Sequence, residues 1–209
     1  MDTRAIEIAS RRNKRIITKA VPGHFATSHS HVNYYIDMTA IKCQNRMAKN
    51  AAKEFAQGYA GTAVDTIICL DGTEIVGAFL ADEISQLGIN AGADIAVITP
   101  ELNSNNQMLF RDNTQRMIWG KRIVLLVASV STGKTINRAL ECIRYYGGES
   151  VGLCALFSAI DSIGDTKIDC IFDGGDLENY HIYSLHDCPN CKEKRKIDAI
   201  INSYGYSKI

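Results

Sequence analysis

The sequence predicts an α/β fold with a doubly wound, mainly parallel sheet and a small hood formed by the two ends of the chain. Apolar runs rich in β-branched residues alternate with segments whose apolar residues recur at helical spacing. The 209 residues are 46% hydrophobic and 22% charged, which is typical of a globular chain with a sizeable core. This composition excludes a disordered, collagenous or fibrous protein.

The first half of the chain contains two kinds of segment. Helices are expected where helix formers space their apolar residues by three or four, and strands where β-branched residues run together. Glycine, proline and aspartate mark the turns between them. In order, we expect a helix at 2–18, a turn at Pro22-Gly23, a strand near 34–36, a helix at 42–60, a buried strand at 64–70, a turn at 71–73 and a helix at 75–88.

The second half repeats the alternation around the most apolar run of the chain, RIVLLVA at 122–128, which we expect to be a central strand. The other expected elements are a strand at 93–99, a polar loop through most of 100–121, a loop at 130–135, a helix at 136–148 and strands at 150–160 and 167–173. This order of elements predicts that the chain is divided into three parts: an N-terminal helix and hood segment at 1–40, an α/β core at 41–185 and a tail at 186–209.

Charge and cysteine usage restrict the function classes. Lys+Arg and Asp+Glu both total 23, so the whole chain has no general attraction to nucleic acid or anionic membranes. No apolar run approaches the ~20 residues of a membrane span, and the N-terminus lacks an apolar signal core. Seven cysteines, mostly inside apolar runs, are typical of a reducing compartment. We expect a cytoplasmic protein without a nucleic-acid or membrane partner.

The loop after the strongest strand is a candidate phosphate site, formed by Ser131, Thr132, Gly133, Lys134 and Thr135. Backbone N–H groups at the start of a helix favour an anion, and the hydroxyls add donors. One alternative is a plain strand-to-helix turn. Another is a P-loop, since ASVSTGKT nearly matches G-x-x-x-x-G-K-S/T. The first glycine is missing, however, and the rest of the chain is too short for the remaining strands of an NTPase sheet.

Four segments in order resemble type I phosphoribosyltransferases, most of all the orotate-specific members. GKRIVLLVASVSTGKT is similar to their phosphoribosyl pyrophosphate motif. GHFATSHSHVNYYIDM resembles their early segment, and VDTIICLDGTEIVGAFLADEI their strand, pyrophosphate loop and helix. HDCPNC lies where several members carry a Cys-Pro-x-Cys tail. The resemblance runs from about Lys19 to Cys191.

This resemblance implies a function, a site and partners. The reaction would join a pyrimidine base such as orotate to ribose 5-phosphate from phosphoribosyl pyrophosphate, in pyrimidine nucleotide synthesis. The 5-phosphate would lie at 131–135, and the pyrophosphate side would be Asp71, Gly72, Thr73 and Glu74, four residues that serve equally well as the start of a helix. Magnesium is the implied cofactor, and a homodimer is the implied assembly.

The sequence departs from the family at the catalytic positions. Val127 and Ala128 stand where the family has an acidic pair beside the ribose hydroxyls. The family's cationic loop falls on TPELNSNN, where Glu101 alone is retained. Arg111, Arg116 and Lys121 are candidates to compensate. No catalytic residue is therefore assigned, and two hypotheses remain: a weakly active or inactive orotate phosphoribosyltransferase-like protein, or a non-catalytic phosphosugar- or nucleotide-binding or regulatory protein on the same fold.

Smaller features are interpreted conservatively. Ser158-Ala159 replaces the family's Asp-Arg at the base end, and Lys19 does not align with the lysine that contacts orotate. Cys188 and Cys191 have zinc-ligand spacing, with His181 and His186 nearby, but a single C-x-x-C favours two free cysteines. His24, His29 and His31 cluster in the early segment, where they are expected either to line a ligand pocket or, as is more common for loop imidazoles, to be exposed. No residue is assigned to a metal from the sequence.

Overall fold

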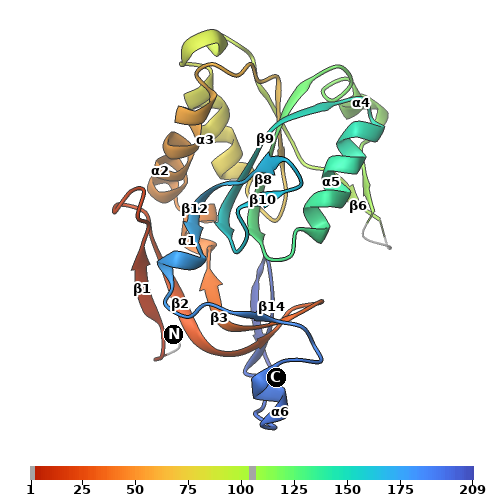
Figure 1. The fold of residues 1–209 in the computed structure, drawn as a ribbon. Coiled ribbons are helices and arrows are strands. Elements are labelled where there is room, and N and C mark those ends of the chain that lie inside the picture. Colours follow the sequence, from red (N-terminus) through yellow and green to blue (C-terminus); the bar gives the residue numbers. More distant parts are fainter. Residues whose placement is uncertain (1–2, 104–106) are drawn as a thin grey trace.

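A five-stranded, fully parallel sheet forms the centre of the computed structural model, which describes residues 3–103 and 107–209 (Figure 1). Its strand order is β12-β9-β8-β4-β5, and each neighbouring pair is parallel. The predicted α/β class and parallel sheet are confirmed. The strands are β4 (Thr66–Cys69), β5 (Ala96–Ile98), β8 (Arg122–Val130), β9 (Glu149–Ser158) and β12 (Asp169–Asp173).

Strand β8 is the middle strand, as its apolar run predicts. Every side chain from Ile123 to Ala128 is buried, because helices cover both faces of the sheet. Val124 and Leu126 point into one hydrophobic cluster, while Ile123, Leu125 and Val127 point into another. Because successive side chains of the strand point to opposite faces, β8 contributes to the hydrophobic core on each side of the sheet.

The helices divide between these two faces. Helices α2 (Asn45–Ala56) and α3 (Glu74–Ile84) cover one face, together with the short α1 (Thr39–Cys43), and α5 (Lys134–Tyr145) covers the other (Figure 1). These helices confirm the elements expected at 42–60, 75–88 and 136–148. Short 3₁₀ turns follow α2 at Gln57–Tyr59 and precede β5 at Gly88–Asn90.

A second, mixed sheet is built from the two ends of the chain. Its order is β13-β3-β2-β14-β15, and β1 also pairs with β2. The C-terminal β14 runs parallel to β2, with Ala199 opposite Phe25. The strands are β1 (Ile6–Ala9), β2 (Ile17–Ala26), β3 (His31–Asp37), β13 (Ile182–Tyr183), β14 (Ala199–Asn202) and β15 (Gly205–Lys208).

The helix expected at 2–18 is wrong over the described residues, because β1 and the start of β2 occupy this segment. Its burial follows a period of two: Ile16, Thr18 and Ala20 are buried, whereas Ile17 is 41% exposed. Strands β1 and β2 pair antiparallel, with Ile8 opposite Thr18. The few isoleucines among the charged residues are compatible with both a helix and a strand. The pairing of β1 with β2 makes this segment a strand.

Short elements complete the chain. The polar loop expected at 100–121 contains a two-stranded hairpin and one helical turn, and residues 104–106 of the segment TPELNSNN lie outside the described residues. The elements are β6 (Glu101–Leu102), β7 (Met108–Leu109), α4 (Asp112–Gln115), β10 (Ser162–Ile163), β11 (Thr166–Lys167), a 3₁₀ turn at Gly174–Asp176 and α6 (Pro189–Lys192).

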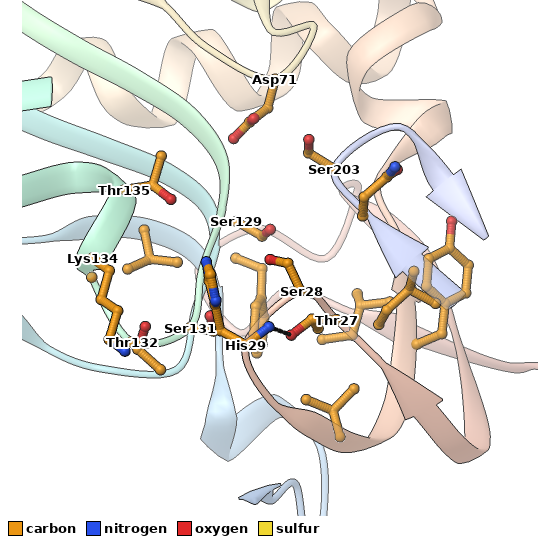
Figure 2. A pocket seen from close by; sticks show the side chains of 18 of the residues that line it. Thr27, Ser28, His29, Asp71, Ser129, Ser131, Thr132, Lys134, Thr135 and Ser203 are labelled. Atoms are coloured by element: carbon orange, nitrogen blue, oxygen red, sulfur yellow. Dashed lines mark hydrogen bonds between the residues drawn. The ribbon is translucent and has the colours of Figure 1, made fainter. Parts of the chain in front are cut away.

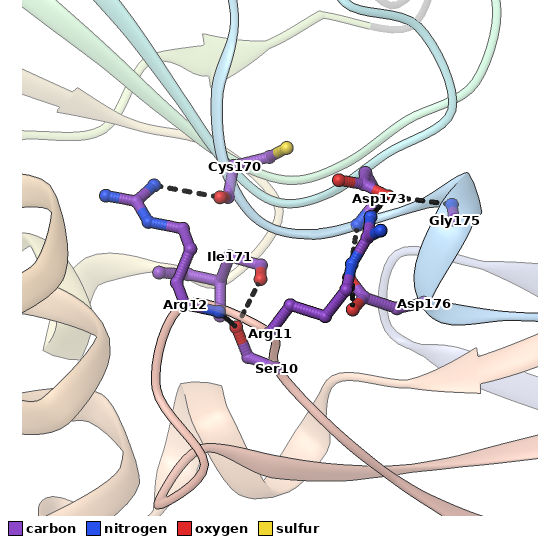
Figure 3. A network of polar contacts seen from close by, with 8 residues as sticks. All are labelled: Ser10, Arg11, Arg12, Cys170, Ile171, Asp173, Gly175 and Asp176. Carbon is purple, nitrogen blue, oxygen red and sulfur yellow. Dashed lines mark hydrogen bonds and ion pairs between the residues drawn. The ribbon is translucent and has the colours of Figure 1, made fainter.

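A polar network joins the second sheet to the end of β12 (Figure 3). The Ser10 hydroxyl donates to the carbonyl oxygen of Ile171 at 2.7 Å, and Arg11 pairs with both Asp173 and Asp176. The connection between β1 and β2 is thus fixed to the main sheet. The division into 1–40, 41–185 and 186–209 stays a prediction. Within the described residues, no helix has the length and apolar character that crossing a membrane requires.

Candidate functional site

A cavity of about 460 Å³ lies between the main sheet and the second sheet (Figure 2). One wall consists of residues at the carboxyl ends of β4, β8 and β9 and the start of α5. The other wall comes from the β2–β3 turn, β3 and the β14–β15 turn. Open parallel sheets usually bind ligands at the carboxyl ends of their strands, so the fold places this cavity where a ligand is expected.

The predicted phosphate loop lines this cavity with all five of its residues, Ser131 to Thr135. Gly133 precedes α5 in the left-handed conformation, with φ of 76°. A Cβ at this position would lie 2.9 Å from the Ile163 side chain, so glycine suits both the backbone and the space. The first N–H groups of α5 have no partner within the helix, which makes this end of the cavity attractive to an anion.

The second predicted loop contributes one residue to the cavity, Asp71. Asp71 and Gly72 both have positive φ, 61° and 77°. The Thr73 hydroxyl points inward and donates to the carbonyl oxygens of Leu70 and Leu126 at 2.8 and 3.2 Å. Glu74 is exposed at the start of α3. Thr73 thus secures the loop to β8, and Asp71 faces the cavity.

Asp71 is the carboxylate of this cavity among the described lining residues. Burial raises its pKa, while hydrogen bonding to Ser203, the charge of Lys42 and the backbone of Ala128 act in the opposite direction. The Lys42 ammonium is buried and donates to the backbone carbonyl oxygens of Asp71 and Ser203 at 3.1 and 2.6 Å. Lys42 therefore ties the β4–α3 loop to the C-terminal hairpin behind the cavity.

The two residues expected from the sequence to replace the family's acidic pair are apolar and buried. Val127 is fully buried and Ala128 is 1% exposed, and neither lines the cavity. Of the candidate compensating cations, Arg111 pairs with Glu101 at 2.6 Å on the surface. Arg116 and Lys121 do not line the cavity either. Lys134 is the lysine that does, at the phosphate loop.

An aromatic pair lies elsewhere on the cavity wall. Phe157, near the end of β9, and Tyr180 have ring centroids 5.1 Å apart in an edge-to-face arrangement, and both line the cavity. Burial raises the pKa of the Tyr180 hydroxyl, so it stays protonated at neutral pH. Ser158 is buried beside this pair, and Ala159 packs against the adjacent core. A flat apolar group fits such a surface.

Several lining residues escaped sequence reasoning. Most of them come from the hood at 1–40 and the tail at 186–209, whose strands pair in one sheet, whereas Ser129 and Tyr180 belong to the part between. In the β2–β3 turn the backbone N–H of His29 donates to the Thr27 hydroxyl at 3.2 Å, and both residues line the cavity (Figure 2). The unpredicted lining residues include Thr27, Ser28, Tyr34, Ser129, Tyr180, Asn202 and Ser203.

Comparison with known proteins connects this geometry to a family. No family model matches the chain. The orotate phosphoribosyltransferase of Caldanaerobacter subterraneus subsp. tengcongensis is 27% identical over 175 residues, 82% of this chain and 84% of that protein. An adenine phosphoribosyltransferase of Rhizobium leguminosarum bv. trifolii is 26% identical over 142 residues, 64% of this chain and 77% of the relative.

Solved structures show the same fold. The UMP synthase of Leishmania donovani superposes with a TM-score of 0.56 at 19% identity, covering 75% of this chain but only 34% of that longer protein. The orotate phosphoribosyltransferase of Mycobacterium tuberculosis, in complex with 5-phospho-α-D-ribosyl 1-diphosphate, superposes at 0.51 with 14% identity, covering 68% of this chain and 82% of the other. With the ordered motifs and the parallel sheet, these relationships show that the chain is similar in sequence and in fold to type I phosphoribosyltransferases.

Proposed function

We propose that this protein binds a phosphoribosyl ligand, either phosphoribosyl pyrophosphate or a nucleotide, and transfers ribose 5-phosphate slowly or not at all. One observation carries the proposal. All five residues of the phosphate loop line the cavity, whereas Val127 and Ala128, which we align with the family's acidic pair, are apolar and buried. Among the described residues, groups suited to binding a phosphate thus line the cavity, whereas the two positions aligned with the acidic pair offer no carboxylate.

The proposed binding mode assigns each part of the ligand to one wall. The 5-phosphate would accept hydrogen bonds from the loop at 131–135, next to the first turn of α5. The ribose would lie along the carboxyl end of β8, near Ser129. The base would rest against Phe157 and Tyr180, whose rings suit a planar heterocycle. Relatives named for orotate and for adenine both match the chain, so the choice of base stays open in this proposal.

Slow turnover follows from the missing charges. The transition state of ribosyl transfer develops positive charge at the ribose and negative charge on the departing pyrophosphate, and the family's carboxylates and cations offset both. Removing even one strong electrostatic group typically lowers turnover by about 10²–10³-fold. Here Val127 and Ala128 supply no carboxylate, and Arg111 is engaged with Glu101 on the surface.

Magnesium is proposed as a cofactor of diphosphate ligands only. Mg²⁺ in phosphate sites is commonly held by one or two carboxylates together with the phosphates of the substrate. Asp71 offers one carboxylate in the cavity, so the residues present fit an ion that arrives with a diphosphate. We expect Mg²⁺ to strengthen the binding of phosphoribosyl pyrophosphate and to leave that of ribose 5-phosphate unchanged.

The alternative is an active orotate phosphoribosyltransferase in which Asp71 takes over the work of the acidic pair. The observation in its favour is that Asp71 is itself a carboxylate that faces the cavity. This alternative predicts rapid, Mg²⁺-dependent consumption of orotate and phosphoribosyl pyrophosphate, abolished by Asp71→Asn. Our proposal predicts no detectable orotidine 5′-phosphate, or formation at least ~10³-fold slower than in active enzymes, with or without that substitution.

The decisive experiment measures binding and turnover on the same preparation. Isothermal titration calorimetry with phosphoribosyl pyrophosphate, ribose 5-phosphate and orotidine 5′-phosphate should show saturable binding. Ribose, the matched ligand without phosphate, should not bind. The loss of orotate absorbance then reports turnover. If none of the phosphorylated ligands binds, the proposed function is wrong; if turnover is rapid, the alternative holds.

A homodimer and a role in nucleotide metabolism are also proposed on the basis of the family. Light scattering at micromolar concentration should give about twice the chain mass of 23.0 kDa. A measured mass of one chain would contradict the dimer while leaving the proposed ligand site untouched.

A further inference from the structure

Four metal-ligating side chains meet near the β2–β3 turn of the second sheet, and none of them lines the cavity described above. They are His24 on β2, His31 on β3, and Cys188 and Cys191 at α6. Their ligand atoms all lie within 4.8 Å of one another, and three of the four residues are buried. The two histidines are separated from the two cysteines by more than 150 residues of chain, so the tertiary fold, not a local motif, brings them together.

We propose that these four residues bind a structural Zn²⁺ ion. Zinc prefers a tetrahedral set of thiolate and imidazole ligands, and two sulfurs with two nitrogens are a common structural set. Two thiolates and two neutral imidazoles together carry a charge of −2, which one Zn²⁺ ion neutralises.

The distances match those of a tetrahedral site. With Zn–S near 2.3 Å and Zn–N near 2.0–2.1 Å, neighbouring ligand atoms should lie about 3.3–3.8 Å apart. His24 Nε2 lies 3.0 Å from His31 Nδ1 and 3.4 Å from Cys188 Sγ. Cys191 Sγ lies 3.7 Å from His24 Nε2 and 3.3 Å from His31 Nδ1. These four separations lie close to that range, and all four ligand atoms lie within 4.8 Å of one another.

The surrounding backbone orients the ligands. His24 Nδ1 lies 3.2 Å from the carbonyl oxygens of Arg195 and Lys196, so its N–H donates there and Nε2 keeps a lone pair for the metal. The register of β2 and β3 shifts between Pro22 and Phe25, and this irregularity includes His24.

The cysteines are held by their own helical turn. Cys188 caps α6, and Pro189 follows as its first residue, where a proline needs no backbone donor. The backbone N–H of Lys192 donates to the Cys188 carbonyl oxygen at 3.1 Å. The C-x-x-C spacing therefore places both thiols on the side that faces the histidines. His181 and His186, which lie closer in sequence, are not in the cluster.

The proposed ion would fix the second wall of the cavity. His24 and His31 flank the turn that carries Thr27, Ser28 and His29 into the cavity. The segment that follows Cys191 leads into β14 and then to Asn202 and Ser203, which also line it. All four metal positions are filled by side chains, so the site is closed in the manner of structural zinc and leaves no position for a substrate.

The test is the metal content of the full-length chain, purified without a chelator and without a histidine tag. Mass spectrometry of the metals should find about one zinc per chain, as a single closed site requires. Replacement by Co²⁺ should give the strong visible absorption of tetrahedral thiolate coordination, and this readout needs no variant. Chelation should lower the melting temperature.

Variants then assign the ligands. Cys191→Ser and His31→Gln should lose the zinc, whereas Cys43→Ser and His186→Gln, matched changes at exposed positions outside the cluster, should retain it. Retention of zinc by both ligand variants would overturn the proposal. So would a native chain without zinc or Co²⁺ absorption, and so would peptide masses showing a Cys188–Cys191 disulfide.

Discussion

At the residue scale, Gly133 is the position on which the proposed phosphate site depends. Its φ of 76° is costly for any other residue, and the space beside it is filled by Ile163. Thr132 adds a hydroxyl on the cavity side of the same loop. Thr132→Ala combined with Gly133→Val should therefore abolish the binding of ribose 5-phosphate measured by calorimetry.

The control for this variant is another glycine with the same backbone conformation. Gly92 has φ of 80°, and an added Cβ would meet nothing within 4 Å. Gly92→Val should cost a similar backbone strain, about 1–2 kcal/mol, without touching the cavity. It should bind ribose 5-phosphate as the unmodified protein does. Equal binding by both variants would show that the ligand is held elsewhere.

A second residue-scale prediction concerns acid stability. Asp65 accepts hydrogen bonds from the Arg122 guanidinium and from its backbone N–H at 2.8–2.9 Å. These bonds lower the pKa of Asp65 to about 2 from its ordinary 3.8. Because the folded pKa is the lower one, the pair stabilises the protein above pH 4, and this contribution is lost as the pH falls from about 4 to 2.

Asp65→Asn should lower the free energy of unfolding at pH 7 by about 1 kcal/mol, a value discounted because Arg122 is largely exposed. The difference between variant and unmodified protein should shrink as the pH approaches 2. Urea denaturation at several pH values measures it, with the exposed Asp94→Asn as control. A deficit that stays constant down to pH 2 would contradict the assigned pKa.

The sequence could predict residues whose neighbours along the chain reveal their role. Ser131 to Thr135 follow an apolar strand and open a helix, and the structure places all five on the cavity. The role of Lys42 could not be predicted from its neighbours along the chain, because its partners Asp71 and Ser203 are distant in sequence. His24 and His31 looked like loop histidines for the same reason.

At the element scale, the close approach of α3 to β4 determines how the helix packs. Gly77 of α3 faces Cys69 of β4, and a Cβ at Gly77 would lie 2.3 Å from the Cys69 sulfur. Both residues are buried in the sheet–helix interface. Glycine is unfavourable inside a helix, so this packing, not helix propensity, explains its presence.

Gly77→Ala should therefore destabilise the protein by about 2 kcal/mol, as overpacked cores do, despite the better helix former. In a Cys69→Ala background the added methyl group gains room, and the same substitution should cost less than half as much. Gly58→Ala, where nothing lies within 4 Å, is the control and should be nearly neutral. Additive effects of the two substitutions in denaturant unfolding would refute the predicted contact.

Helices and strands were predictable where the spacing of the apolar residues along the chain matched one of them clearly. The continuous apolar run of β8 identified the central strand, and its burial on both faces follows from helices on both sides. The segment before residue 18 carried too few apolar residues to distinguish a helix from a strand. Its true state depended on pairing with β2 and, through Arg11 and Arg12, on the end of β12.

At the scale of the whole molecule, the C-terminal tail contributes to only one of the three hydrophobic clusters, the one within the second sheet. The two large hydrophobic clusters around the parallel sheet contain no residue beyond Tyr180. The third cluster, within the second sheet, joins Phe25, Val32 and Tyr35 to Ala199 and Ile201 of the tail. The main sheet thus has a complete core without the tail, while the cavity needs both sheets for its walls.

Deleting residues 186–209 should therefore leave a folded parallel sheet and remove one wall of the cavity. Far-ultraviolet circular dichroism should show native-like helix content and a cooperative thermal transition at a lower temperature, because only the third cluster is exposed. Inorganic phosphate should still bind at Ser131–Thr135, whereas phosphoribosyl pyrophosphate should bind more weakly, since Asn202 and Ser203 are gone. The intact chain is the reference for both ligands. A truncated chain without a cooperative transition would show that residues 186–209 belong to the folding unit of the core, because Lys42 would then have lost an acceptor on which the β4–α3 loop depends.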